Sequence, residues 1–249
     1  MRTECSSVNL MERFFASRNG NDVFLTPEDE HHLLHVLRAE VGMEVEVVDE
    51  GDLFLTKVVS LNPCRLTIVR PLERNGELPA KLVLAFSLLK GGHDELVLMK
   101  GTELGASAFV PFISSRCIIR LEEKEKEKRF ARYQKIVAGA ASQSKRLTVP
   151  SLSPILSFAQ TLAYPADHHF FAYENLADGT FNLPEAFASV KPGETALCMV
   201  GPEGGFSPEE AKEAVNKGWT SVSLGRRILR AETASLYLAS VFAFLEERK

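Results

Sequence analysis

Cysteine is scarce in this chain, and the four that it has, Cys5, Cys64, Cys117 and Cys198, are far apart. No two of them have C-x-x-C spacing, so neither a zinc site nor a disulfide framework is indicated. Long apolar runs are missing as well. None approaches the length of a transmembrane helix, and the first residues lack the apolar core of a signal peptide. These absences predict a cytosolic protein without a membrane anchor.

Nucleotide-phosphate signatures and an excess of basic residues are also absent. Neither G-x-G-x-x-G nor G-x-x-x-x-G-K-[ST] occurs, so a nucleotide phosphate is not the default ligand. The formal net charge is −4, from 29 Lys and Arg against 33 Asp and Glu. Because the whole molecule repels a polyanion, a nucleic-acid partner would have to bind a local basic patch.

The chain is long enough for two modest domains, with 249 residues of which 45% are hydrophobic. Near the N-terminus, Thr26 to Arg38 has an N-cap, a proline at the first helical position and apolar residues at helical spacing. Short strands at hairpin spacing follow over 44–49, 53–59 and 65–69. This order predicts a small β-barrel with one helix, over residues 1–74.

A different pattern follows a linker at 71–79. Strands are predicted over 82–88, 108–113, 170–173, 195–200 and 219–224, and helices over 94–104, 122–141 and from Ala231 toward Glu246. Alternating strands and helices predict an α/β domain over 75–249, with a parallel sheet covered on both faces. The charged run at 122–128 is typical of a solvated helix face.

Ten residues, Gly201 to Glu210, have the order expected of a ligand site. An apolar strand enters them, and a helix leaves them with Ser207 as N-cap, Pro208 at the first position and Glu210 completing a capping box. The three glycines allow positive φ angles and close approach of a ligand to the main chain. The alternative is an ordinary turn in which the glycines serve the turn alone.

A second loop of this kind carries three arginines, in Gly225-Arg226-Arg227-Ile228-Leu229-Arg230. Planar guanidinium groups suit RNA phosphates and base edges. The same arginines could instead be a solvated helix entrance with ion pairs to Glu232. Two glycine loops, each after a strand and before a helix, together predict one pocket.

These residues resemble a known family. Gly201-Pro202-Glu203-Gly204-Gly205 and Leu224-Gly225-x-Arg227-Ile228-Leu229-Arg230-x-Glu232-Thr233-Ala234 are similar to the ribosomal RNA small subunit methyltransferase E family, of the knotted SPOUT class. The resemblance continues through Lys90-Gly91, Lys100, Glu103-Leu104-Gly105, Pro111, Arg116, Gln143, Arg146-x-x-x-Pro150, Arg13-x-Phe15 and His32-x-x-x-Val36-Leu37-Arg38. It covers nearly the whole chain from Met11, which resembles the family's usual start, so Met1 to Leu10 are expected to be either an extension or the product of a misassigned start site.

Four positions depart from the family pattern. Arg226 replaces the usual proline, Ala231 a threonine, Ser142 an acidic residue and Lys145 a glycine. None of them removes an arginine or glycine that the expected chemistry needs.

The resemblance implies an S-adenosylmethionine (SAM)-dependent enzyme that methylates N3 of a uridine in 16S ribosomal RNA of the small subunit. It implies a PUA-like RNA-binding domain at 1–74, a trefoil-knotted methyltransferase domain at 75–249, a cytoplasmic location and a homodimer. The final helix, with Leu236, Leu238, Val241, Phe242 and Leu245, is suited to a subunit interface.

The resemblance also implies site residues. SAM would be held by Met199, Val200, Gly201, Glu203, Gly204, Gly205, Leu224, Gly225, Ile228, Leu229, Arg230, Thr233 and Ala234. RNA would be contacted by Arg13, His32, Arg38, Arg116, Gln143, Arg146 and Arg227. Glu203 could equally brace its loop.

Transfer of an activated methyl group requires N3 to be in line and to lose its proton. A guanidinium, from Arg230 or Arg13, would stabilise the uracil anion. No general base is identifiable, and water is one possible acceptor. His31 and His35 are one helical turn apart, but no further ligand pair accompanies them, so no metal is expected.

Two other classes stay open at this stage. One is a non-catalytic RNA-binding module with vestigial glycine loops, and the other is a different two-domain α/β protein that binds an ordinary nucleotide. The intact glycines and Arg230 disfavour the first, and the missing phosphate loops disfavour the second.

Overall fold

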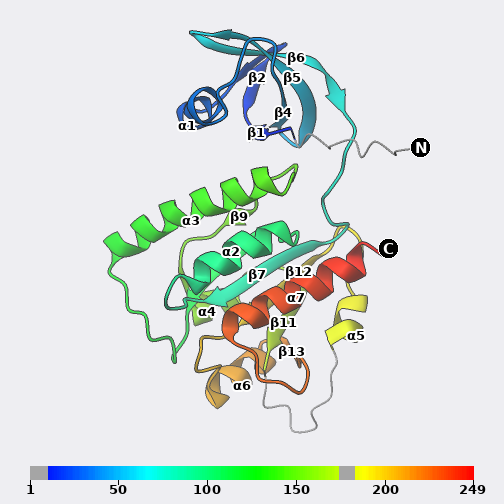
Figure 1. Cartoon of the computed structure of the whole chain (residues 1–249). Coiled ribbons are helices and arrows are strands. Elements are labelled where there is room, and N and C mark those ends of the chain that lie inside the picture. The colour runs from blue at the N-terminus through cyan, green and yellow to red at the C-terminus, as the bar shows by residue number, and fades with distance from the viewer. Residues whose placement is uncertain (1–10, 174–182) are drawn as a thin grey trace, which may run out of the picture. The chain divides into compact units, whose positions relative to one another are not determined.

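The computed structural model describes residues 11–173 and 183–249 (Figure 1). Residues 1–10, including Cys5, lie outside the described residues. The chain divides into two compact units. The first unit holds Met1–Gly76 and Lys145–Thr148, and the second holds Glu77–Ser144 and Val149–Lys249. Lys145–Thr148 therefore belongs to the first unit, although the sequence assigned it to the second domain.

A curled, mixed sheet forms most of the first unit (Figure 1). Its strands are β1 (Arg13–Phe15), β2 (Ser17–Asn19), β3 (Asp22–Phe24), β4 (Glu44–Asp49), β5 (Asp52–Leu61) and β6 (Cys64–Leu72). Within the described residues the order is β1-β4-β5-β6-β3-β2, with β1 parallel to β4 and the other neighbours antiparallel. Irregular register in the β5–β6 pair adds twist, as β-bulges do. The sheet is a half-barrel, because its edge strands β1 and β2 do not pair in the described structure.

The predicted N-terminal helix begins where the sequence indicates and ends early. Helix α1 (Pro27–His31) follows Thr26, whose Oγ1 accepts a hydrogen bond from Asp29 N at 3.1 Å. The chain then widens into one π-helical turn, η1 (His32–Val36). Arg38 has a φ of 54°, which is incompatible with a continuing helix. Leu33 of this segment is buried in the core of the first unit.

The second unit is built on a parallel sheet. Its strands are β7 (Lys81–Ser87), β8 (Ala108–Ile113), β9 (Ser151–Leu152), β10 (Leu156–Ser157), β11 (His168–Ala172), β12 (Thr195–Val200) and β13 (Thr220–Val222). In the described residues the order is β10-β8-β7-β12-β11-β13, and β9 also pairs with β8. Every pairing is parallel, as the alternating pattern predicts. The short strands β9 and β10 were not predicted.

Helices cover both faces of this sheet. They are α2 (His93–Glu103), α3 (Glu123–Gln143), α4 (Phe158–Leu162), α5 (Leu183–Ala188), α6 (Pro208–Asn216) and α7 (Ala231–Glu246). Because strand side chains alternate, Leu82 and Leu84 of β7 pack with α2, α3, α5 and α7, whereas Val83 and Ala85 pack with α4 and α6. None of the described helices is long and apolar enough to cross a membrane.

Helices α2 and α3 are joined by a buried polar cluster. The carboxylate of Asp94 accepts hydrogen bonds from Tyr133 and, at 2.9 Å, from Arg129. Burial and the neighbouring Asp94 carboxylate raise the pKa of the Tyr133 hydroxyl. This cluster fixes the first turn of α2, which borders the site described next.

Candidate functional site

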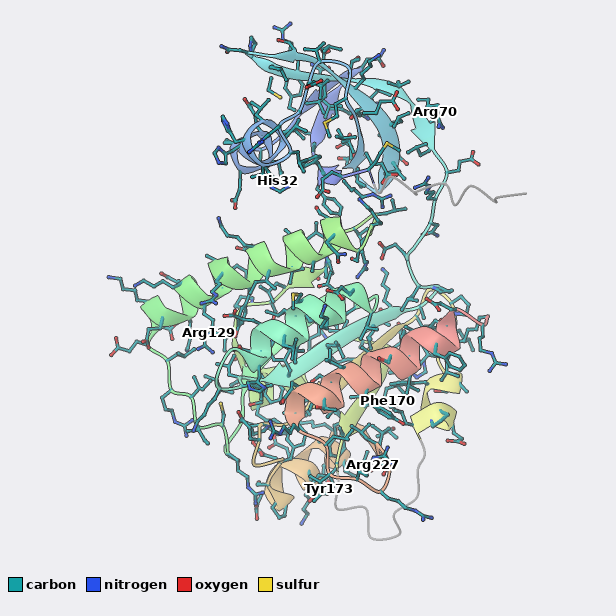
Figure 2. All side chains as sticks on the ribbon, viewed as in Figure 1. His32, Arg70, Arg129, Phe170, Tyr173 and Arg227 are labelled. Carbon is teal, nitrogen blue, oxygen red and sulfur yellow. The ribbon has the colours of Figure 1, made fainter. Side chains whose placement is uncertain are left out.

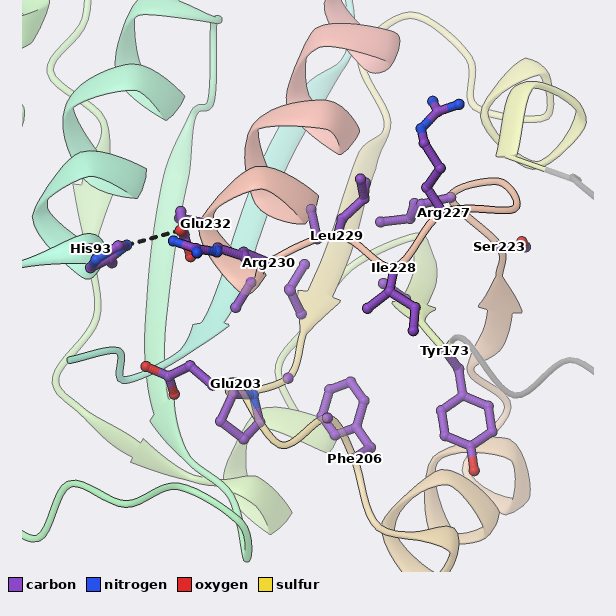
Figure 3. A pocket seen from close by; sticks show the side chains of 18 of the residues that line it. His93, Tyr173, Glu203, Phe206, Ser223, Arg227, Ile228, Leu229, Arg230 and Glu232 are labelled. Carbon is purple, nitrogen blue, oxygen red and sulfur yellow. Dashed lines mark ion pairs between the residues drawn. The ribbon is translucent and has the colours of Figure 1, made fainter. Parts of the chain in front are cut away.

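A cavity of about 530 Å³ opens in the second unit, where the carboxyl ends of β7, β11, β12 and β13 meet (Figure 3). In open parallel sheets, ligands bind outside the carboxyl ends of strands. The cavity is lined by Lys90, Gly91, His93, Ala172, Tyr173, Val200, Gly201, Pro202, Glu203, Gly205, Phe206, Ser223, Leu224, Gly225, Arg227, Ile228, Leu229, Arg230, Ala231, Glu232 and Ala234.

The first glycine loop, Gly201–Ser207, folds tightly on itself. A Cβ at Gly201 would lie 3.2 Å from the backbone C of Gly205 and 3.2 Å from the backbone N of Phe206. Gly205 has a φ of 65°, in the region that favours glycine. The helix after the loop has the predicted N-cap, and the capping box of Ser207 with Glu210 is present. The glycines thus serve the turn and also leave the main chain open to the cavity.

Neighbouring segments hold this first loop in place. Glu210, although buried, also accepts a hydrogen bond from Ser115 N at 2.8 Å. The Arg116 guanidinium donates to Gly204 O at 3.0 Å, and the Glu203 carboxylate accepts from Lys90 N at 3.1 Å. Glu203 therefore braces its loop while it lines the cavity.

The second glycine loop, Ser223–Arg230, is far more exposed. Gly225 has a φ of 103°, and its N–H donates to the Ser223 hydroxyl at 3.3 Å. Ile228 is 86% exposed although it lines the cavity. Figure 3 shows Leu229 and Arg230 on the cavity side, with Arg227 directed away from Arg230. Apolar side chains and main chain of this loop thus face the first loop.

An ion pair closes one side of the cavity. His93 Nδ1, at the start of α2, lies 2.9 Å from the Glu232 carboxylate in the first turn of α7 (Figure 3). The surrounding charges are the Glu203 carboxylate, the Lys90 ammonium and the Arg230 guanidinium. The cavity thus combines an apolar, glycine-walled part with a charged edge, which is usual for small-molecule sites.

The comparisons with known proteins agree with this arrangement. Residues 76–243 match the RNA methyltransferase domain family. Over 231 residues, the chain is 35% identical to a ribosomal RNA small subunit methyltransferase E from Bacillus subtilis, covering 90% of each chain. The chain belongs to the ribosomal RNA small subunit methyltransferase E family.

Solved structures of relatives share the fold. A ribosomal RNA small subunit methyltransferase E from Neisseria gonorrhoeae, bound to S-adenosyl methionine, superposes with a TM-score of 0.83 at 31% identity, over 94% of this chain and 98% of that one. A putative methyltransferase from Legionella pneumophila, in complex with the cofactor SAM, gives 0.82 at 26% identity with the same coverage. Both the half-barrel sheet and the parallel sheet are therefore features of this family.

Most residues expected to bind the cofactor line this one cavity. They are Val200, Gly201, Glu203, Gly205, Leu224, Gly225, Ile228, Leu229, Arg230 and Ala234. Three others do not line it. Met199 is fully buried within β12, Gly204 packs beside Arg116, and Thr233 is exposed on the first turn of α7. The side chains of Met199 and Thr233 follow the strand and helix periods away from the cavity.

Several lining residues were missed by the sequence interpretation. Ala172 ends β11 and Tyr173 follows it, Phe206 lies within the first loop, and His93 is the first residue of α2. The family motif Lys90-Gly91 was a signal for the last of these, because it stands just before His93. Nothing local in the sequence indicates that β11 ends at the same cavity.

The residues expected to contact RNA are distributed over both units. Arg13, His32, Arg38 and Arg146 belong to the first unit, and Arg116, Gln143 and Arg227 to the second. Arg38, Arg116, Gln143 and Arg227 are exposed, and His32 is partly exposed. Figure 2 shows Arg227 and Tyr173 at the same end of the second unit.

Arg13 is a structural residue of the first unit. It is 2% exposed, and its guanidinium donates to the Glu46 carboxylate at 2.7 and 2.9 Å. It also donates to the carbonyl oxygens of Lys145 and Arg146. A guanidinium with all these partners is not available to a uracil, so the expected catalytic or RNA-binding role of Arg13 is corrected to a structural one. Arg146 is likewise buried.

Lys145 explains one departure from the family pattern. Its φ of 61° is left-handed, the conformation in which glycine is favoured. Its ammonium group donates to Met11 O, and burial lowers its pKa. The side chain therefore contributes a bond that glycine could not make.

The histidines considered for a metal do not form a ligand cluster. The rings of His31 and His35 are 4.6 Å apart. Among the described residues, no group of three or more His, Cys, Asp or Glu side chains could hold a metal ion.

Proposed function

We propose that this protein transfers a methyl group from SAM to N3 of a uridine in 16S ribosomal RNA of the small subunit. The observation that carries the proposal is the cavity between the two glycine loops, in a chain of a family whose solved relatives bind SAM. We therefore also propose that the protein acts in the cytoplasm, where ribosomes are assembled.

The residues present fit the cofactor. Main chain at Gly201, Gly205 and Gly225 lets a flat adenine approach closely, and Leu224 and Leu229 supply apolar walls. Carboxylates of Glu203 and Glu232 suit the positive groups of SAM. SAM supplies a methyl group that its positive sulfur has already activated. The protein must hold N3 in line with that group and stabilise the charge that develops on uracil.

Arg230 is the proposed stabiliser of the uracil anion. It lines the cavity beside the charged edge and forms no ion pair in the described part of the chain. A guanidinium directed at O2 or O4 acts most strongly as negative charge develops in the transition state. With Arg13 buried against Glu46, Arg230 is the candidate that we retain.

Methylation is tested with purified full-length protein, SAM carrying a labelled methyl group, and unmodified 16S RNA, both free and assembled into small subunits. We expect label in 3-methyluridine, identified by mass spectrometry of the digested RNA. Label in another nucleoside would overturn the uridine assignment. The comparison of free and assembled RNA identifies the substrate form.

Ligand class is tested separately by thermal shift with SAM, ATP and NAD. Selective binding of SAM raises the unfolding midpoint by mass action. If ATP or NAD raises the unfolding midpoint instead, the protein is a nucleotide-binding protein of another class. RNA binding without any SAM effect would favour a non-catalytic RNA-binding module.

We also propose that exposed Arg38 and Arg227 contact RNA phosphates. Each Arg→Ala change should weaken RNA binding and make it less dependent on salt, because one phosphate contact is lost. Filter binding at several salt concentrations measures both effects. An unchanged salt slope would remove the residue from the RNA surface.

A homodimer is proposed on the family resemblance. Leu238 and Phe242 of α7 are buried in the core of their own unit, so they are corrected from interface to core residues. Partly buried Val241 and Leu245 and exposed Phe244 remain available for an interface. Light scattering at micromolar concentration should give the mass of two chains, and a monomer would contradict the proposal.

A further inference from the structure

His93 and Glu232 form an oriented pair at the edge of the cavity. The distance from Nδ1 of the imidazole to Oε1 of Glu232 is 2.9 Å, and both residues line the cavity (Figure 3). A carboxylate this close to Nδ1 favours the tautomer in which Nδ1 carries the proton. The second nitrogen, Nε2, then carries a lone pair.

Three features hold the pair in place. Glu232 is largely buried in the first turn of α7. The residue after His93 is Asp94, whose carboxylate is bound by Tyr133 and Arg129. The imidazole lies against Gly91, where a Cβ would be 3.3 Å from Cδ2 and 3.6 Å from Nε2. The ring orientation is therefore determined by two helices and one loop.

Nε2 of His93 is accessible. The side chain is 42% exposed, and Nε2 has no hydrogen-bond partner among the described residues. A base oriented by a carboxylate, with its other nitrogen free toward a substrate, is the arrangement used in general-base catalysis.

We propose that His93 is the proton acceptor for uracil N3, with Glu232 as its positioning residue; this rests on the proposed function. The N3–H bond breaks and its proton goes to Nε2. The electron pair left on N3 forms the bond to the methyl carbon, while the carbon–sulfur bond breaks and its pair goes to sulfur. The imidazolium, stabilised by the Glu232 carboxylate, then releases its proton to water.

The other charged groups around His93 are consistent with this role. The charged residues that line the cavity with it are the acidic Glu203 and Glu232 and the basic Lys90, Arg227 and Arg230. On its own helix, Asp94 is bound to Arg129 and Glu95 to Arg132. Glu232 is thus the carboxylate that contacts the imidazole directly.

A second pair provides a matched control. His168 Nε2 lies 2.8 Å from Glu194, at the opposite end of the sheet where β11 begins, and neither residue lines the cavity. His168→Gln makes the same chemical change to a similar pair, and we expect no effect on methyl transfer.

The test is single-turnover transfer to 16S RNA with saturating SAM, measured across the range in which imidazole titrates. The wild-type rate should rise with pH and then level off as the ring becomes neutral. His93→Gln should lower the rate near neutral pH by about 10²- to 10⁴-fold, the usual scale of general-base catalysis. Its rate should keep rising with pH, because uracil must then ionise without the base. SAM affinity by calorimetry should be retained.

Two further variants separate chemistry from structure. Added imidazole should restore transfer by His93→Ala and have no effect on His168→Ala. The transfer rate of Glu232→Gln should level off at a lower value than the wild-type rate. It should also level off at lower pH, because an amide stabilises the imidazolium less than a carboxylate does. A wild-type pH profile in His93→Gln, loss of SAM binding with the rate, or no rescue by imidazole would each overturn the proposal. If the wild type makes no methyluridine at all, the proposed function itself fails, which is a distinct result.

Discussion

The two glycine loops of the cavity are built in opposite ways. The first is held by three hydrogen bonds from two other segments, Lys90 and Ser115–Arg116, and its Phe206 packs against Phe112, with ring centroids 6.4 Å apart. The second exposes Arg226, Arg227 and Ile228. The same strand–glycine–helix pattern thus produces a fixed wall on one side and an adaptable one on the other.

From this difference we expect the wall at the first loop to be fixed before a ligand binds, and the wall at the second loop to adjust. A fixed wall contributes affinity because it loses no conformational freedom on binding. An exposed wall can close over the ligand, and its apolar residues then become buried. Mutations in the first loop should therefore lower the stability of the fold, whereas those in the second should change ligand binding and the rate of methyl transfer.

The largest effect is expected for Phe206→Ala. The ring is buried among aromatic side chains, and removal of such a ring costs about 3–5 kcal/mol of unfolding free energy. Denaturant unfolding of the full chain measures it. Ile228→Ala, in the second loop, is the control and should leave stability within about 0.5 kcal/mol of wild type. An equal loss of unfolding free energy in both variants would contradict the proposed difference between the loops.

Arg230→Ala should come next. It should lower single-turnover transfer by about ten- to a thousandfold, the scale of losing one donor to a developing anion, with SAM affinity nearly kept. Arg132→Ala is the control, since Arg132 is exposed and pairs with Glu95 away from the cavity. If Arg230→Ala also loses SAM, Arg230 belongs to the cofactor site.

Gly205→Val and Gly225→Val sharpen the comparison further. Both glycines have left-handed φ angles, 65° and 103°, where a side chain costs about 1–3 kcal/mol. Calorimetry should show weaker SAM binding for both. The Gly205 variant should also have a lower thermal midpoint, because its loop cannot relax. Unchanged affinity in both variants would remove the cavity as the cofactor site.

The smallest effect is expected for Ile228→Ala on SAM affinity. If the second loop closes over the ligand, loss of this apolar contact should weaken binding by about 1 kcal/mol, from the area that closure buries. Calorimetry with wild type and variant measures it. An identical affinity would show that the second loop stays open.

Much of this architecture could be predicted because it depends on neighbouring residues. The N-cap at Ser207 and the capping box with Glu210 involve residues three apart, so the pattern itself indicates the helix start. The strand at Thr195–Val200 and the last helix, Ala231–Glu246, have the predicted bounds for the same reason. Short β9 and β10 carried no such periodic signal.

Other features could not be predicted because their partners are distant in the sequence. Arg13 appeared free to bind RNA, and only the fold brings Glu46 and the carbonyls of Lys145 and Arg146 to it. The same holds for His93, whose partner Glu232 lies on the last helix. A guanidinium or an imidazole has no intrinsic role, since its neighbours set its charge and its access.

By itself, then, the sequence determined most of the longer strands and helices, the two glycine loops and the family, because caps, turns and hydrophobic periods act over a few residues. Only the tertiary structure decided which arginine is buried, which loop is fixed, and which histidine meets a carboxylate at the cavity. Those outcomes depend on the order of strands in the sheet, which brings the loop after Val200 beside the loop after Val222 and the start of α2 beside the start of α7.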